Sequence, residues 1–147
     1  MVGAGSASRR PHDADGPTST GDPHMSKPMK MLLNGIRLLV VIQIVMGILI
    51  WMGKGAEQVN LHMALGMLLA VLVVSFAVMG KAAGAPKSLT WVTIMWAIVT
   101  IAVGVEQRRV LAGSSHWVLQ LVHRLRGIGM AGQAERMARA LKEKLTA

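Results

Sequence analysis

Long stretches without charge dominate the middle of the chain, and they predict helices that cross a membrane. The clearest is LHMALGMLLAVLVVSFAVM, residues 61–79, which contains no charged residue. About 20 residues rising ~1.5 Å each cross a hydrocarbon core ~30 Å thick, so a run of this length fits one transmembrane helix. Three further spans are expected around it, and the four predicted helices cover about 31–52, 58–80, 88–106 and 115–132.

The two ends of the chain differ from this apolar middle. Residues 1–30 are rich in Gly, Ser, Pro and charged residues and show no apolar period, which predicts a disordered N-terminal segment. His12 and His24 fall inside that segment and are given no role. Residues 133–147 repeat basic residues in an amphipathic pattern, which predicts a basic C-terminal helix that continues into the lipid headgroups or the cytoplasm.

Basic residues are distributed unevenly around the predicted spans. Eleven lysines and arginines lie in the segment through Arg37, the loop 81–87 and the tail after Gln133, against three in the two opposite loops. Because cytoplasmic loops carry the excess of basic residues, both termini are expected in the cytoplasm. The expected fold is therefore all-α, an integral-membrane four-helix bundle with up-down topology that forms one domain over residues 31–132.

The composition narrows the classes of function. Charged residues make up 16% of the chain, against roughly 25% in soluble domains. A net charge of +9 would suggest nucleic acid in a soluble protein, but here the basic residues flank apolar runs and indicate contact with a lipid bilayer, not nucleic acid. The chain has no cysteine, which excludes disulfides, iron–sulfur ligation and covalent c-type haem attachment.

Three histidines are expected at related depths in this bundle. The second and fourth spans run parallel, so His62 near the start of one lies level with His116 and His123 in the other. Gly66 follows His62 by four residues, and Gly127 follows His123 by four, which places each glycine on its histidine's own helix face, one turn away. A glycine at that position leaves room for a flat macrocycle against the helix.

Polar and ionisable groups at membrane depth are costly, and by default they mark a functional site. Two neutral imidazoles on facing helices can fill both axial positions of a haem iron, an arrangement suited to electron transfer rather than oxygen chemistry. Gln43 and Gly47 in the first span are expected to face a neighbouring helix rather than lipid.

A short, cysteine-free chain with four membrane helices and histidines on the second and fourth resembles the cytochrome b561-type proteins and related bacterial four-helix b-type cytochromes. The resemblance covers about residues 36–132. It implies one non-covalent haem b, electron transfer in the bacterial cytoplasmic (inner) membrane, and a quinone or redox protein as partner. Carried over to this chain, His62 is the ligand from the second span and His123 the ligand from the fourth, with His116 as the alternative. Arg124, beside the ligand, would pair with haem propionates.

The same residues allow other interpretations. His62 can be an interfacial histidine satisfied by water, and the 12 methionines are more typical of packing than of copper ligation. The aromatic content of 3% is thin for a haem pocket, and Arg124 and Arg126 also suit a haem-free accessory subunit packed among other membrane subunits. We find no nucleophile–base pair, HExxH motif, phosphate-binding glycine loop or transmembrane carboxylate pair, which favours a redox carrier or subunit over a stand-alone enzyme.

Overall fold

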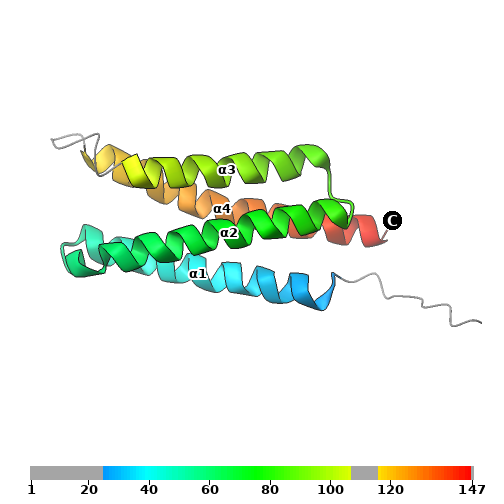
Figure 1. Cartoon of the computed structure of the whole chain (residues 1–147), viewed down its shortest axis with the longest axis horizontal. Coiled ribbons are helices and arrows are strands. Elements are labelled where there is room, and N and C mark those ends of the chain that lie inside the picture. Colours follow the sequence, from blue (N-terminus) through cyan, green and yellow to red (C-terminus); the bar gives the residue numbers. More distant parts are fainter. Residues whose placement is uncertain (1–24, 107–115, 147) are drawn as a thin grey trace, which may run out of the picture.

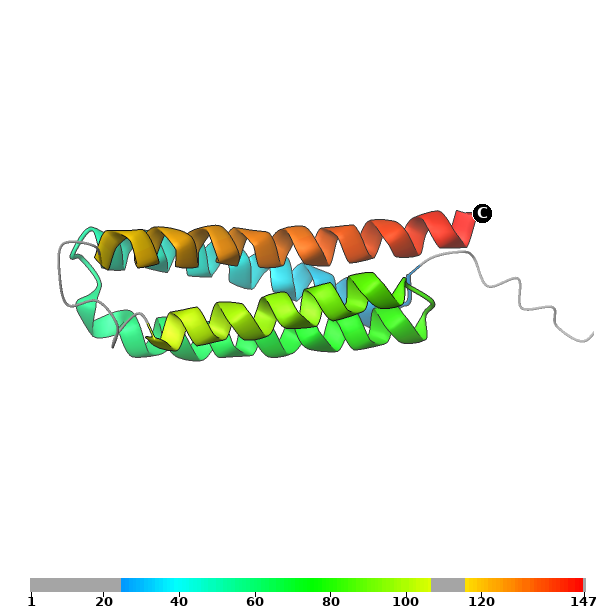
Figure 2. The same cartoon turned by 90° about the horizontal axis from the view of Figure 1, so that it is seen from above.

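The computed structural model describes residues 25–106 and 116–146, which form helices and turns and contain no strand. The prediction of an all-α protein is therefore confirmed for the described residues. The helices are α1 (Lys27–Trp51), a short 3-10 helix η1 (Ala56–Gln58), α2 (Val59–Ala82), α3 (Lys87–Glu106) and α4 (His116–Thr146). Figures 1 and 2 show the four long helices lying side by side, with successive helices running in opposite directions.

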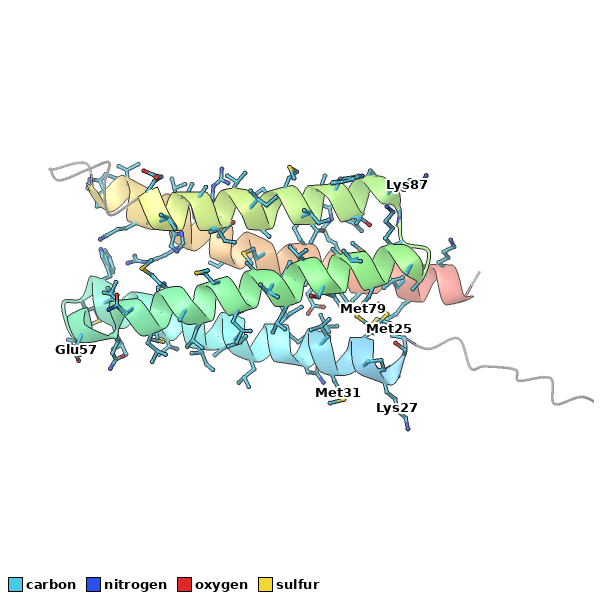
Figure 3. All side chains as sticks on the ribbon, viewed as in Figure 1. Met25, Lys27, Met31, Glu57, Met79 and Lys87 are labelled. Carbon is cyan, nitrogen blue, oxygen red and sulfur yellow. The ribbon has the colours of Figure 1, made fainter. Side chains whose placement is uncertain are left out.

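The two ends of the bundle carry different parts of the chain. One end holds Lys27, the turn between α2 and α3, and the end of α4, and we refer to it as the terminal end. The opposite end holds the connection from α1 to α2 and the start of α4, and we refer to it as the histidine end. Lys27 and Lys87 lie at the terminal end and Glu57 at the histidine end (Figure 3).

Three of the described helices, α1, α2 and α3, are long and apolar enough to cross a membrane. Their outward faces carry large apolar side chains, such as Leu38 on α1 and Val71 on α2, which are about 60% exposed. A helix satisfies its own backbone hydrogen bonds, so such a surface can lie directly against hydrocarbon. These three helices indicate a multi-pass membrane protein, whereas α4 does not belong to this apolar group.

Local sequence explains where several helices begin and end. Pro28 lies in the first turn of α1, where its missing N–H would have no partner in any case. Gly53 and Gly84 have positive φ angles of 74° and 94°, which glycine adopts without strain just after α1 and in the turn before α3. The backbone oxygen of Gly84 accepts a hydrogen bond of 3.0 Å from Lys144 Nζ, so the end of α4 is tied to the α2–α3 turn.

Buried side chains concentrate in the half of the bundle toward the terminal end. Phe76 of α2, Ile36 of α1 and Met137 of α4 are at most 1% exposed and belong to one cluster. The approach of α2 to α4 is close, because a Cβ on Gly80 would lie 2.9 Å from Met137 Sδ. The terminal half is therefore the packed core that holds the four helices in register, and the other half is left more open.

The first described residues belong to this core rather than to a disordered segment. Residues 25–30 fall within the predicted disordered stretch 1–30, yet Lys27–Lys30 form the first turn of α1. Met25 and Met29 are 6% and 4% exposed, in the same buried cluster as Met137. Burial against a distant helix compensates the ordering entropy that local sequence cannot. Residues 1–24, with His12 and His24, lie outside the described residues.

The C-terminal segment after Gly132 continues α4 without a break. Its buried positions, including Met137 and Leu141, face the core, and its exposed positions include Arg136 and Arg139. The same segment contacts α1 through an ion pair, in which Arg37 Nε lies 2.6 Å from Glu135 Oε1. This half of α4 is therefore a packed part of the bundle.

The Arg37–Glu135 pair provides a test by pH. Hydrogen bonds from the Arg37 guanidinium hold the pKa of Glu135 below its ordinary value. Stabilisation from a lowered carboxyl pKa is complete above the unfolded pKa of about 4.3 and is lost as pH falls through the folded pKa. Exposed ion pairs contribute about 0.2–1 kcal/mol, so we expect Glu135→Gln to lower the free energy of unfolding by about 0.5 kcal/mol at neutral pH. Thermal unfolding in detergent over an acid pH series should show wild type and variant converging; a constant difference would contradict the assignment.

Candidate functional site

A cavity of about 350 Å³ lies in the histidine half of the bundle and borders the packed core at Val40, Leu69 and Met130. Its volume falls within the roughly 300–1,000 Å³ of small-molecule and cofactor sites. Side chains from all four long helices line it, and most of them are apolar. The polar members are few and come from all four long helices: Gln43, His62, Thr100, Gln120, His123 and Arg124.

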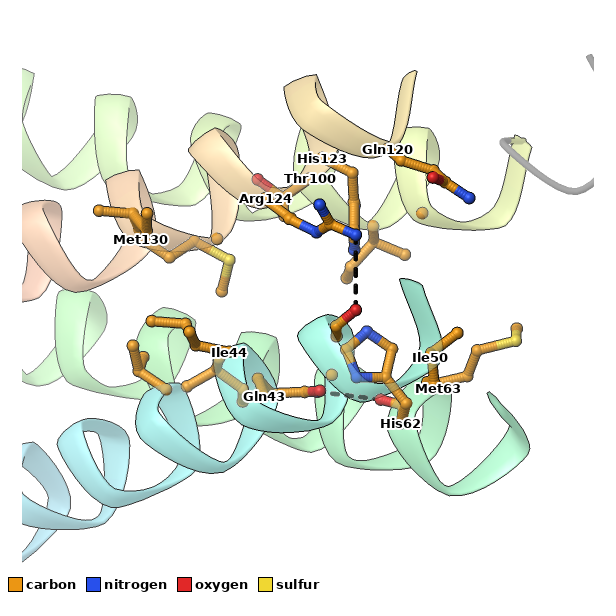
Figure 4. A pocket seen from close by; sticks show the side chains of 18 of the residues that line it. Gln43, Ile44, Ile50, His62, Met63, Thr100, Gln120, His123, Arg124 and Met130 are labelled. Atoms are coloured by element: carbon orange, nitrogen blue, oxygen red, sulfur yellow. Dashed lines mark hydrogen bonds between the residues drawn. The ribbon is translucent and has the colours of Figure 1, made fainter. Parts of the chain in front are cut away.

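Two histidines face each other across this cavity. His62 comes from the first turns of α2 and His123 from α4, and Figure 4 shows both rings directed into the space between the helices. Their ring centres are 6.4 Å apart, and the ring planes meet at 70°. On each ring the Nδ1 atom is buried and has no hydrogen-bond partner among the described residues. A buried polar atom without a partner costs about 1–3 kcal/mol, so these rings have binding capacity that the described chain leaves unused.

Glycines of α1 and α3 allow the two rings to lie where they do. A Cβ built on Gly104 of α3 would come within 2.9 Å of His123 Cε1, closer than real Cβ contacts. A Cβ on Gly47 of α1 would lie 3.7 Å from His62 Cε1, an ordinary contact. The position of His123 therefore depends on the absence of a side chain at residue 104, whereas His62 has more freedom.

The two glycines expected beside the histidines have different surroundings, although both line the cavity. A Cβ on Gly127 would meet nothing within 4 Å, so the space over this part of α4 is open. A Cβ on Gly66 would lie 2.9 Å from Gln43 Nε2, so the space over α2 holds the amide of Gln43. The Cβ position of Gly127 is thus clear of other atoms, while Gly66 allows the Gln43 side chain of α1 to approach α2.

Gln43 connects α1 to the histidine on α2. Its Nε2 donates a hydrogen bond of 2.9 Å to the backbone oxygen of His62. This contact confirms the expectation that Gln43 faces a neighbouring helix, and the nearby His62 ring confirms it for Gly47. The Oε1 atom of Gln43 is buried and has no partner among the described residues. Gln43 therefore adds a third unsatisfied polar atom to the histidine half of the bundle.

Two arginines of α4 are held against tryptophan rings. The Arg124 guanidinium lies 4.5 Å from the centre of the Trp51 ring at the end of α1, and its Nη2 is 3.5 Å from the Gly47 oxygen. Arg126 lies 5.6 Å from the centre of the Trp96 ring on α3. Since Arg124 also lines the cavity, it places a positive charge at the wall beside His123 (Figure 4).

Most of the residues predicted for the site lie around one cavity. His62, His123, Gly66, Gly127 and Arg124 all line one cavity. His116 begins α4 seven residues before His123, and its side chain lies outside the described ones.

Sequence reasoning missed the roles of Gln43 and Gly104 at the site. Gln43 was expected only to face a neighbouring helix, and Gly104 was one of several small residues in its span. Gln43 contacts His62 and Gly104 lies against His123 only because α1 and α3 have particular rotations about their own axes. The sequence did carry a signal for Gln43, because it is a polar residue inside an apolar run.

Comparisons with other proteins add no assignment. No family model matches the chain, and neither the curated proteins nor the solved structures that were searched contain a match. Among residues 25–106 and 116–146 there is also no group of three or more His, Cys, Asp or Glu side chains that could hold a metal ion.

Proposed function

We propose that this protein is a membrane electron carrier that binds one haem b between His62 and His123. The observation that supports the proposal is the pair of imidazole rings, 6.4 Å apart, that face one another from α2 and α4 across a mostly apolar cavity.

The spacing of the two rings fits a shared metal between them. An imidazole nitrogen binds a metal ion at about 2.0 Å, and the ring centre lies about 1.2 Å from that nitrogen. Two axial imidazoles on one metal therefore place their ring centres about 6.4 Å apart. The separation of the His62 and His123 ring centres matches this value, which supports a metal shared by the two rings.

The ligand count favours haem over a bare metal ion. Zinc and similar ions take four or more ligands from the protein or from water, and the described residues provide two histidines without a third candidate nearby. A haem brings four ring nitrogens of its own, so it needs only two axial ligands from the protein. A haem iron with both axial positions filled by histidine supplies one-electron transfer rather than oxygen chemistry.

Other residues of the cavity suit the flat ring and the carboxylate groups of a haem. The open space over Gly127 can receive a flat ring against α4, because no atom lies within 4 Å of its Cβ position. Arg124 offers a guanidinium to carboxylate groups, and charge-assisted bonds of this kind are among the strong hydrogen bonds. Its present partners, the Trp51 ring and the Gly47 oxygen, hold it at the edge of the cavity.

The site also restricts where electrons would enter and leave. The cavity lies at the histidine end, so a redox protein would dock there or a quinone would approach from the surrounding lipid. We place the protein in a bacterial cytoplasmic membrane with both termini on the cytoplasmic side, from the distribution of basic residues and the resemblance to b-type cytochromes. With α4 as a fourth span, the cavity would open on the outer side.

The deciding experiment is spectroscopic. The full chain is produced in bacterial membranes with haem precursor supplied and is then purified in detergent. A reduced-minus-oxidised spectrum should show the sharp alpha band of a low-spin b-type haem, with one haem per chain by extraction. Protein that binds no haem, even after reconstitution with hemin, would refute the proposal.

Gly104 and Gly47 provide a matched pair of variants. We expect Gly104→Ala to lower the haem content about tenfold, because its Cβ would lie 2.9 Å from His123 Cε1 and displace the ring. Gly47→Ala should keep the haem, since its Cβ would lie 3.7 Å from His62 Cε1. Both variants add the same methyl group to a helix, so helix propensity is matched. Equal haem content in the two proteins would contradict the geometry.

The second candidate is a haem-free accessory subunit of a larger membrane complex. The composition of α4 favours it, because α4 is not among the helices apolar enough to cross a membrane. A helix of that kind is expected to be covered by other protein rather than lipid. Purified protein without haem that co-purifies with defined membrane subunits through α4 would support this alternative.

A further inference from the structure

We propose that the surface between α1 and α4 at the terminal end binds the headgroup of an anionic phospholipid. We call this surface the α1–α4 seam. It is formed by two stripes of polar side chains, Lys30, Asn34 and Arg37 on α1 and Glu135, Arg139 and Lys142 on α4. The proposal is independent of the haem site, which lies in the other half of the bundle.

Contacts between Arg37 and its neighbours fix the register of the two stripes. Arg37 donates to Glu135 through Nε at 2.6 Å and through Nη2 at 3.0 Å, and its Nη1 donates to Asn34 Oδ1 at 3.3 Å. Lys30 lies seven residues before Arg37, so it lies on the same face of α1, two turns nearer the terminal end. Arg139 and Lys142 follow Glu135 by four and seven residues on α4. The stripes therefore run side by side.

Positive charge exceeds negative charge within the seam. Glu135 lies within electrostatic reach of Arg37, Arg139 and Lys142, and it contacts Arg37 directly. Together with Lys30, the described seam holds four cations and one carboxylate. Cations on neighbouring turns of two adjacent helices repel one another, and an additional anion would relieve that repulsion. Arginine and lysine side chains are also the groups that bind phosphate.

An exposed apolar surface continues from the seam toward the histidine end. Leu38 and Val41 on α1 are 63% and 59% exposed, and Leu125 and Ile128 on α4 are 59% and 53% exposed. A phospholipid offers a phosphate for the charged part and acyl chains for the apolar part. A free phosphate ion would use only the first, which is why the proposal commits to a lipid. Juxtamembrane basic residues attract anionic lipid in this way.

The experiment titrates the full chain in uncharged detergent with phosphatidylglycerol, phosphatidylcholine or inorganic phosphate, and follows thermal stabilisation. Arg139→Gln with Lys142→Gln removes two charges from the seam and leaves the Arg37–Glu135 pair. Lys81→Gln with Lys87→Gln removes two charges at the same end of the bundle, at the end of α2 and the start of α3, and serves as the control. Lys30→Gln tests the α1 side of the seam separately, and circular dichroism checks that each variant is folded.

We expect wild type to respond to phosphatidylglycerol and not to phosphatidylcholine. The seam double variant should need about tenfold more phosphatidylglycerol for the same stabilisation, and Lys30→Gln should shift in the same direction. The control variant should respond like wild type. Equal losses in the two double variants would show a diffuse attraction and overturn the site. Equal stabilisation by inorganic phosphate would overturn the lipid as its occupant.

Discussion

Replacing His62 or His123 by alanine is expected to abolish the proposed haem binding almost completely. Each ring would provide one of two axial ligands, and the other polar groups lining the cavity, such as Gln43 and Gln120, carry amides that bind iron poorly. We expect the haem content per chain to fall about tenfold or more in each variant, since loss of a metal ligand outweighs loss of a supporting contact. Extraction of haem from purified protein, together with the reduced spectrum, measures the effect.

Two further variants make this result specific. His24→Ala changes a histidine outside the described residues and should retain haem at the wild-type level. His116→Ala tests the alternative ligand on α4, seven residues before His123. If His116→Ala loses haem while His123→Ala keeps it, the second ligand moves to residue 116. If His62→Ala and His123→Ala both keep full haem content, the cavity between α2 and α4 is not the haem site.

The helices could be predicted from sequence because their physical cause is local. A chain in lipid must satisfy its backbone within each segment, so an uncharged run such as residues 61–79 has few alternatives to a helix. The start of α1 could not be predicted in the same way. Met25 and Met29 are buried in a cluster that includes Met137, more than one hundred residues later in the chain, and no local pattern shows that contact.

The candidate site likewise has features that the sequence predicts and features that depend on packing between helices. The depths of His62 and His123 follow from helix order and length, which the sequence provides. Their surroundings depend on the rotation of α1 and α3 about their axes, and that rotation is set by packing. Gly104 is one of several small residues in its span, and only the structure shows that it lies against the His123 ring. Gly66 was expected to make room for a macrocycle, but the Gln43 amide lies over it.

The largest change in stability is expected at Gly129 of α4, which lies against the rigid indole ring of Trp96 on α3. A Cβ on Gly129 would lie 2.5 Å from Trp96 Cζ2 and 2.8 Å from Trp96 Nε1. The indole cannot yield easily, because its Nε1 donates a hydrogen bond of 3.0 Å to the Arg126 oxygen and Arg126 covers the ring. Overpacking costs about 1–3 kcal/mol and loss of the hydrogen bond about 1 kcal/mol. We expect Gly129→Ala to unfold several degrees below wild type.

Gly132→Ala on the same helix is the matched control, because a Cβ there would meet nothing within 4 Å. Both substitutions replace glycine by alanine inside α4, which by itself favours the helix by about 0.5–1 kcal/mol. Gly132→Ala should therefore unfold at or slightly above the wild-type temperature, and the two variants should differ by about 2–4 kcal/mol. Thermal unfolding followed by circular dichroism in detergent measures both. Equal unfolding temperatures would mean that Trp96 does not lie against α4 at Gly129.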